Sequence, residues 1–236
     1  MAKERDFVSE ILSIQSRNRY EQYFHSIIMR LENLETLYYG SENLNDEMLK
    51  YFPIGLVACT EGYYRAVIKQ LIDFGGDYLN NASKLKTQFD FNIVKAVHQK
   101  TITLGDFIAH LSRINNLDDI NSNLSILTAK DFLEELKKVY DRYEVEVLQQ
   151  EKKLIIENPT EIYNGIKKTF ELRHIYAHEI ADDSKLEKAD IDICFKSVKL
   201  MMKATSEFVS ELLYPNAPLT QVAITQSAID DYEEEV

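Results

Sequence analysis

Arg173, His174 and His178 lie within the segment FELRHIYAHE and are the side chains of this chain best suited to chemistry. An arginine can hold an anion through two parallel N–H donors. On the helix predicted from Pro159 onward, Arg173 projects from the middle of an apolar stripe. That stripe consists of Ile162, Ile166, Phe170, Ala177 and Ile180. The two histidines fall on the flank where the stripe turns polar.

A guanidinium on an apolar face needs a partner, because burying an unpaired charge costs several kcal/mol. Arg173 must therefore meet a carboxylate, extend to the edge of the stripe, or face a cleft that receives an anion. Glu61, on the helix predicted after Pro53, is a candidate carboxylate, although Arg65 at i+4 competes for it. On this purely structural interpretation, the arginine only forms an ion pair and the histidine rings are only packed against their neighbours.

A metal site is the second chemical possibility, with His174 and His178 as an i, i+4 pair beside Glu179. Zinc sites need a third protein ligand, and HIYAHE is not the HExxH pattern. The other histidines, His25, His98 and His110, are scattered along the sequence. We therefore predict no metal and no cofactor.

The elements that position these residues are predicted to be helices, because seven glycines and four prolines interrupt the 236 residues only rarely. We expect helices over 3–39, ended by Gly40, and from Pro53 to the Gly75–Gly76 pair. Short helices are expected at 91–99 and 104–112, within a less regular segment, 80–126, that is rich in Asn, Ser and Asp. Tyr63, Tyr64, Tyr140 and Tyr143 are expected to be core residues rather than base-stacking platforms.

The C-terminal half carries clearer start signals. Thr128 and Asp131 open a helix predicted to run to Tyr143. Asn158-Pro159-Thr160-Glu161 combines an N-cap, a proline at N1 and a glutamate at N3, and its helix should reach Ile180. Ser184 and Glu187 form a predicted capping box for a last helix that ends near Tyr214-Pro215.

We predict an all-α fold, a helical bundle in one compact domain. Residues 1–127 form its N-terminal part, with an insert near 80–126; residues 128–214 form the motif-bearing hairpin; 215–236 is a tail. The net charge of −12 argues against broad binding along the phosphate backbone of a nucleic acid and against adhesion to acidic membranes. No apolar run is long enough to cross a bilayer. The two cysteines, Cys59 and Cys194, fit buried thiols in a reducing, cytoplasmic compartment.

The FELRHIYAHE segment resembles the signature of HEPN domains, which is an arginine, a polar residue, a few more positions and then a histidine. The loop ADDSK and the long helix after it are similar to the family's arrangement as well. In detail the resemblance covers residues 128–214. The long N-terminal region and the 80–126 segment look like additions to a minimal HEPN bundle.

The resemblance implies a metal-independent endoribonuclease that pairs through its motif-bearing helices, so that two Arg/His sets share one cleft. His178 would act as the acid or base and Arg173 would hold the scissile phosphate, while His174 would orient either one. Attack by the 2′-hydroxyl of the RNA would leave a cyclic phosphate. Such domains often act as toxins or in anti-phage defence, with an antitoxin or another protein as partner.

One departure and one alternative belong with this resemblance. Ile180 stands where a subgroup paired with nucleotidyltransferase antitoxins has tyrosine, which argues against modification by such a partner. The alternative is a catalytically silent HEPN-like module that keeps the dimer interface and serves as a scaffold for a partner. Burial of Arg173 against Glu61 would favour this alternative, as the acidity of the chain does.

Overall fold

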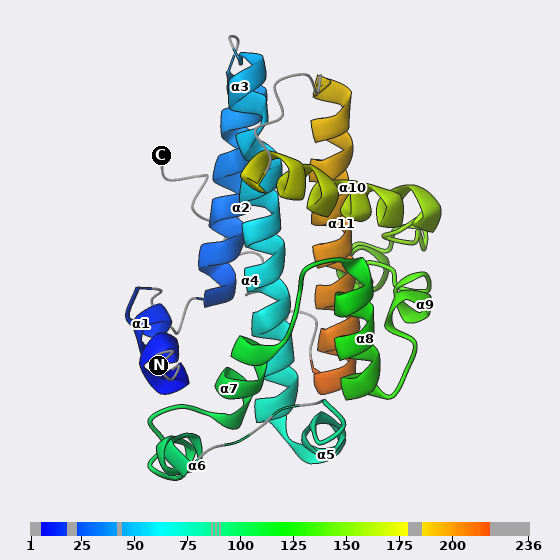
Figure 1. Ribbon diagram of the computed structural model, residues 1–236. Helices are drawn as coiled ribbons and strands as arrows, with labels where there is room; N and C mark the ends of the chain where they lie inside the picture. Colours follow the sequence, from blue (N-terminus) through cyan, green and yellow to red (C-terminus); the bar gives the residue numbers. More distant parts are fainter. Residues whose placement is uncertain are drawn as a thin grey trace, which may run out of the picture.

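The computed structural model describes residues 6–17, 23–41, 44–85, 87, 89, 91–178 and 186–217. Of Tyr23 and His178 only the backbone is described. These residues are 76% helical and contain eleven α-helices and no strand (Figure 1). The predicted all-α fold class is therefore confirmed.

One helix, α4 (Tyr51–Phe74), occupies the centre of the bundle. It packs against α2 (Tyr23–Gly40), α7 (Leu104–Leu111), α10 (Pro159–His178) and α11 (Lys188–Leu213). Figure 1 shows α2, α4 and α11 running along one another, with α10 lying across α4 and α11. Most of α4 is buried as a result, and burial of apolar surface there is the main source of stability.

The remaining elements surround this centre. They are α1 (Phe7–Arg17), α3 (Asp46–Leu49), α5 (Gly76–Ala82), α6 (Phe91–His98), α8 (Leu117–Thr128), α9 (Phe132–Leu136) and a π-helical turn at Tyr143–Val147. Buried apolar side chains from Ile11 to Leu213 form a single core cluster. No described helix is long and apolar enough to cross a membrane.

Two of the four tyrosines expected in the core are fully buried. Tyr63 is 3% and Tyr64 1% exposed, and burial raises the pKa of both hydroxyls. The Tyr63 hydroxyl donates to the carbonyl of Met202, and the Tyr64 hydroxyl lies 3.1 Å from Thr205 Oγ1. These two rings join α4 to α11. Tyr140 is half-buried and Tyr143 is 39% exposed, so the expectation is wrong for Tyr143.

Several predicted boundaries are confirmed. Helix α2 ends at Gly40, and α4 ends before Gly75, whose φ of 90° suits glycine. At the start of α10, Asn158 Oδ1 accepts a hydrogen bond from the Glu161 amide at 3.3 Å, as the predicted N-cap requires. Helix α11 ends at Leu213, next to the predicted stop.

Three predicted helices need correction. The segment 3–39 contains two helices that pack on different partners: α1 lies against α6 and α7, and α2 lies against α4. The helix predicted to reach Tyr143 ends at Leu136, because Tyr140 instead forms an antiparallel bridge with Leu154. Helix α11 takes Glu187 as its N-cap, and the Glu187 amide lies 3.3 Å from Asp190 Oδ2. Other predictions fall on Ser184, Ile180 and 218–236, which lie outside the described residues.

The segment 80–126 is more regular than predicted, because it includes α8. Asn116 caps this helix by accepting from the Asp119 amide at 2.8 Å. The polar residues that suggested a loop lie outside this helix's buried stripe, and two of them, Asn121 and Ser125, accept hydrogen bonds from the backbone at the start of α9. Its inner stripe is buried and consists of Leu117, Ile120, Leu124 and Leu127.

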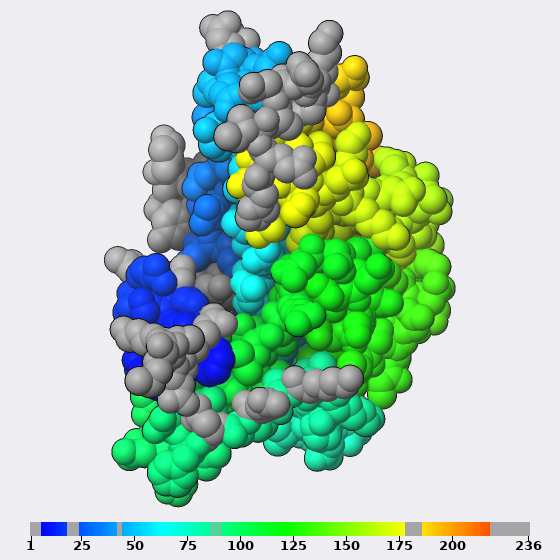
Figure 2. Space-filling view, viewed as in Figure 1, coloured from blue at the N-terminus to red at the C-terminus, as the bar shows by residue number. Residues whose placement is uncertain are grey.

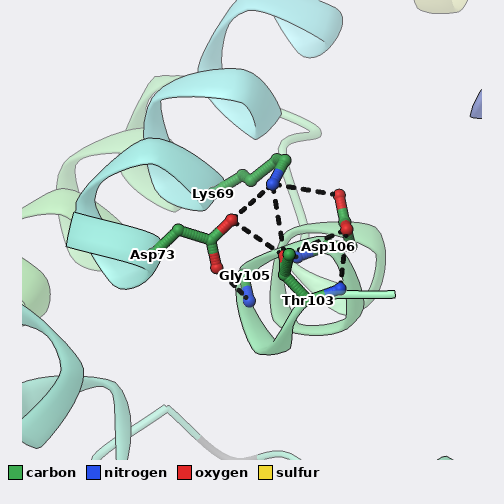
Figure 3. A network of polar contacts seen from close by, with 5 residues as sticks. All are labelled: Lys69, Asp73, Thr103, Gly105 and Asp106. Atoms are coloured by element: carbon green, nitrogen blue, oxygen red, sulfur yellow. Dashed lines mark hydrogen bonds and ion pairs between the residues drawn. The ribbon is translucent and has the colours of Figure 1, made fainter. Parts of the chain in front are cut away.

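Helix α7 begins on the side of α4, through the polar network drawn in Figure 3. Asp73 of α4 accepts from the Gly105 amide at 3.0 Å and lies 2.8 Å from the Thr103 hydroxyl. Lys69 lies 3.4 Å from Asp106, which closes the capping box of α7 with Thr103. This docking fixes α7 and therefore the loop after it, which borders the candidate site.

Gly165 lets α10 approach α11 closely, and this contact sets the distance between the two helices. A Cβ added at Gly165 would lie 2.0 Å from Ser197 Oγ and 2.8 Å from Ser197 Cβ. Distances this short force a backbone shift of one helix relative to the other.

We predict that Gly165→Ala destabilises the fold by about 1–3 kcal/mol, because this strain outweighs the roughly 1 kcal/mol that alanine gains over glycine in a helix. Urea unfolding followed by circular dichroism measures the loss. Gly40→Ala is the matched control, since a Cβ there meets nothing within 4 Å among the described residues. A Ser197→Gly background should reduce the Gly165→Ala penalty; equal penalties in both backgrounds would contradict the explanation.

Candidate functional site

A shallow, open groove lies between α10 and the start of α8. In Figure 2 the yellow surface of α10 and the green surface of α8 meet in this region. Its lining comes from one face of α10 and from the residues just before α8: Asn115, Asn116, Lys167, Phe170, Glu171, Arg173 and His174. Two of the three predicted site residues are therefore on its wall.

Arg173 lies where the buried stripe of α10 leaves the core. Ile166 and Phe170 are 1% and 7% exposed, whereas the Arg173 side chain is 33% exposed. Its Nη2 lies 3.5 Å from Glu61 Oε1 of α4. Of the three environments predicted for this guanidinium, the structure combines two, a carboxylate partner and the edge of a groove.

Glu61 is shared between two arginines. Its other oxygen, Oε2, lies 3.4 Å from Arg65 Nη1, so the competition expected from the i, i+4 spacing is present as a three-residue cluster. The glutamate is 18% exposed and each arginine about one third. Arg65 Nε is buried with no hydrogen-bond partner in the described part of the chain. The cluster has more donors than its one carboxylate can use.

The sequence predicts Arg65 only as a competitor for Glu61, and the structure adds it to the charged cluster beside the groove. The available signal is that Glu61 and Arg65 stand at i, i+4 spacing on a largely apolar helix. The loop residues Asn115 and Asn116 had no such signal. Asn116 caps α8 and the Asn115 amide donates to Asp119 Oδ2 at 3.0 Å, so local hydrogen bonds hold this wall of the groove.

His174 is exposed on the groove face of α10, adjacent to Arg173. His178 is the last residue of α10, and its side chain lies outside the described residues. Helical spacing places it one turn beyond His174, on the same flank. No cluster of three or more His, Cys, Asp or Glu side chains suited to a metal ion occurs in the described ranges.

The groove can bind one anionic group. Arg173 and Lys167 provide charge on one wall, and the asparagine side chains on the other can give or accept hydrogen bonds. Glu61 and Glu171 limit the excess of positive charge to a small region. This arrangement suits recognition of a single phosphate better than of a long phosphate backbone.

Comparison with protein-family models, curated proteins and solved structures gives no match to this chain.

We predict that Arg173→Ala changes the free energy of unfolding by less than about 1 kcal/mol. The ion pair with Glu61 is long and partly exposed, and pairs of this kind contribute roughly 0–1 kcal/mol. Thermal and urea unfolding measure the change. A double-mutant cycle with Glu61→Gln gives the coupling, and a loss above about 3 kcal/mol would indicate a structural role for Arg173.

Proposed function

We propose that the chain is a metal-independent endoribonuclease of the HEPN type, acting at the groove that Arg173 and His174 line. The observation that carries this proposal is the position of Arg173. It sits at the mouth of an open groove, next to a histidine, and a second arginine shares its carboxylate.

The proposed reaction is a transesterification within the RNA. The 2′-hydroxyl attacks the adjacent phosphorus, the bond to the 5′-oxygen of the next nucleotide breaks, and a 2′,3′-cyclic phosphate remains. One proton leaves the 2′-oxygen and one is delivered to the leaving oxygen, and His178 carries out acid–base transfer at one of these atoms. Arg173 binds the phosphate and stabilises its growing charge, and His174 orients the phosphate or His178.

In the state described here, Glu61 occupies the guanidinium that the phosphate would need. A bidentate contact to phosphate is stronger than a single contact of 3.5 Å, so an RNA phosphate can displace Glu61 from Arg173. Arg65 remains as the partner of the released carboxylate. We propose that a homodimer through the motif-bearing helices places two such sets across one cleft and doubles the local positive charge.

The second candidate is a catalytically silent helical module that dimerises and regulates a partner protein. The Arg173–Glu61 pair and the net charge of −12 favour it. The proposed nuclease belongs in the cytoplasm, in a toxin or anti-phage setting with a protein that restrains it. If the chain is instead the silent module, the groove surface serves as its interface with the partner protein.

We expect the purified protein to cleave total RNA or a tRNA pool in the presence of EDTA and to leave cyclic-phosphate ends. Arg173→Ala and His178→Ala should each lower the cleavage rate at least about 100-fold, the usual contribution of a charge-stabilising or acid–base group. His174→Ala should have a smaller effect.

The control is Lys196→Ala, which removes an exposed cation that pairs with Glu161 on the far part of α10. It should cleave like the wild type. Circular dichroism and light scattering confirm that each variant is folded and has the wild-type oligomeric state. A folded dimer that does not cut RNA, or cutting that EDTA abolishes, would refute the nuclease and favour the silent module.

A further inference from the structure

Helix α6 presents an outward face that the proposed reaction does not use. Phe91, Val94, Lys95 and His98 have the spacing i, i+3, i+4 and i+7, which places them on one side of the helix. All of them are exposed, Phe91 to 80% and Val94 to 52%. The opposite side is buried through Ile93 and Ala96. The outward face is therefore in contact with solvent, although it combines apolar side chains with a lysine and a histidine.

Phe89, just before α6, extends this surface. It is 50% exposed, and its ring lies 5.1 Å from that of Phe107, which belongs to the buried core. The Phe89 ring thus packs against Phe107 and still exposes half of its surface to solvent. Two phenyl rings next to a lysine and a histidine form what we call the α6 face: Phe89, Phe91, Val94, Lys95 and His98.

The segment that carries the α6 face has a net charge opposite in sign to that of the chain as a whole. Residues 84–100 contain four lysines and one aspartate, whereas the whole chain has 27 basic and 39 acidic residues. Lys84, Lys95 and Lys100 are exposed, and in the described part of the chain none of them pairs with a carboxylate. Elsewhere ion pairs neutralise Lys50, Lys69, Lys130, Lys137, Lys138, Lys168, Lys196, Lys199 and Lys203.

We propose that the α6 face, with Lys84 and Lys100, binds a single-stranded segment of RNA through base stacking on Phe91 and Phe89 and through contacts of the lysines with phosphates. Exposed aromatic rings interleaved with unneutralised cations are the features that single-strand binding requires. This inference rests on the proposed function, because it assigns that substrate class a second contact away from the groove.

The geometry favours RNA over other partners. Helix α6 has eight residues and exposes only a narrow apolar strip, too small for an interfacial membrane helix or for a stable protein interface. Helix α7 connects it to the groove: α7 begins at the Figure 3 network and leads into Asn115 and Asn116. The α6 face, at the lower end of the view in Figure 1, and the groove thus lie near opposite ends of α7, and we expect one RNA strand to contact both.

The test measures binding separately from cleavage. The probe is a fluorescein-labelled, single-stranded 2′-O-methyl RNA of about 12 nucleotides, which lacks the 2′-hydroxyl needed for attack, with anisotropy as the readout and EDTA present. We expect Phe91→Ala to weaken binding by about 5- to 100-fold, and Phe91→Tyr to retain it, since tyrosine also stacks. The Lys95→Gln/Lys100→Gln variant should reduce the slope of log K against log salt by about 1.4.

The matched controls are Tyr51→Ala and Lys153→Gln. Tyr51 is 63% exposed at the other end of α4, and Lys153 is an exposed lysine without a carboxylate partner among the described residues. Both should bind like the wild type. Equal loss in the controls, unchanged binding in the α6 variants, absence of RNA binding by the wild type, or binding to anionic vesicles alone would each overturn the proposal.

The two proposals fail in different ways. If the α6 variants lose binding while the wild type does not cleave unmodified RNA, the α6 face binds RNA and the nuclease is wrong. If cleavage depends on Arg173 but substitution of Phe91 or Lys95 changes neither binding nor cleavage, the nuclease proposal stands and the α6 inference is wrong.

Discussion

Burial of α4 among its neighbours organises this molecule, and this helix carries a single polar stripe. Helix α4 is covered by α2, α7, α10 and α11, and its polar residues Glu61, Arg65, Lys69 and Asp73 recur every four positions. The upper pair meets Arg173 from α10, and the lower pair holds the start of α7. Apolar packing places α10 and α7 against α4, and the partly exposed charges of this stripe then find their partners on those two helices.

The close approach of α10 to α11 completes this arrangement. Gly165 lets α10 sink against Ser197, and Ile162 and Ile166 are then buried while Arg173, two turns further on, emerges at the groove. The arginine meets Glu61 because both helices are held by apolar packing elsewhere. The ion pair is a consequence of that packing and contributes little to it.

Because the chain is acidic, the described cations that lack a carboxylate partner are the groups best able to bind an external anion. Most described lysines outside 84–100 pair with carboxylates, which lowers their value for binding an external anion. Beside the groove, Arg173 and Arg65 share one glutamate, whereas Lys95 of the α6 face and the nearby Lys84 and Lys100 have no carboxylate partner among the described residues. Binding of a strongly anionic ligand is thereby confined to small regions on a surface that repels it elsewhere.

The amino-acid pattern is enough to predict the all-α class, the start of α10 at Asn158-Pro159 and the emergence of Arg173 from an apolar stripe. These features depend on hydrogen bonds and periodicities within a few residues. By contrast, contacts between distant segments set the packing of α1 on α6 and α7, the burial of one side of α8, and the contact of Arg173 with Glu61. Residues 112 positions apart in the chain are brought together only by the packing of α10 on α4, which no local pattern encodes.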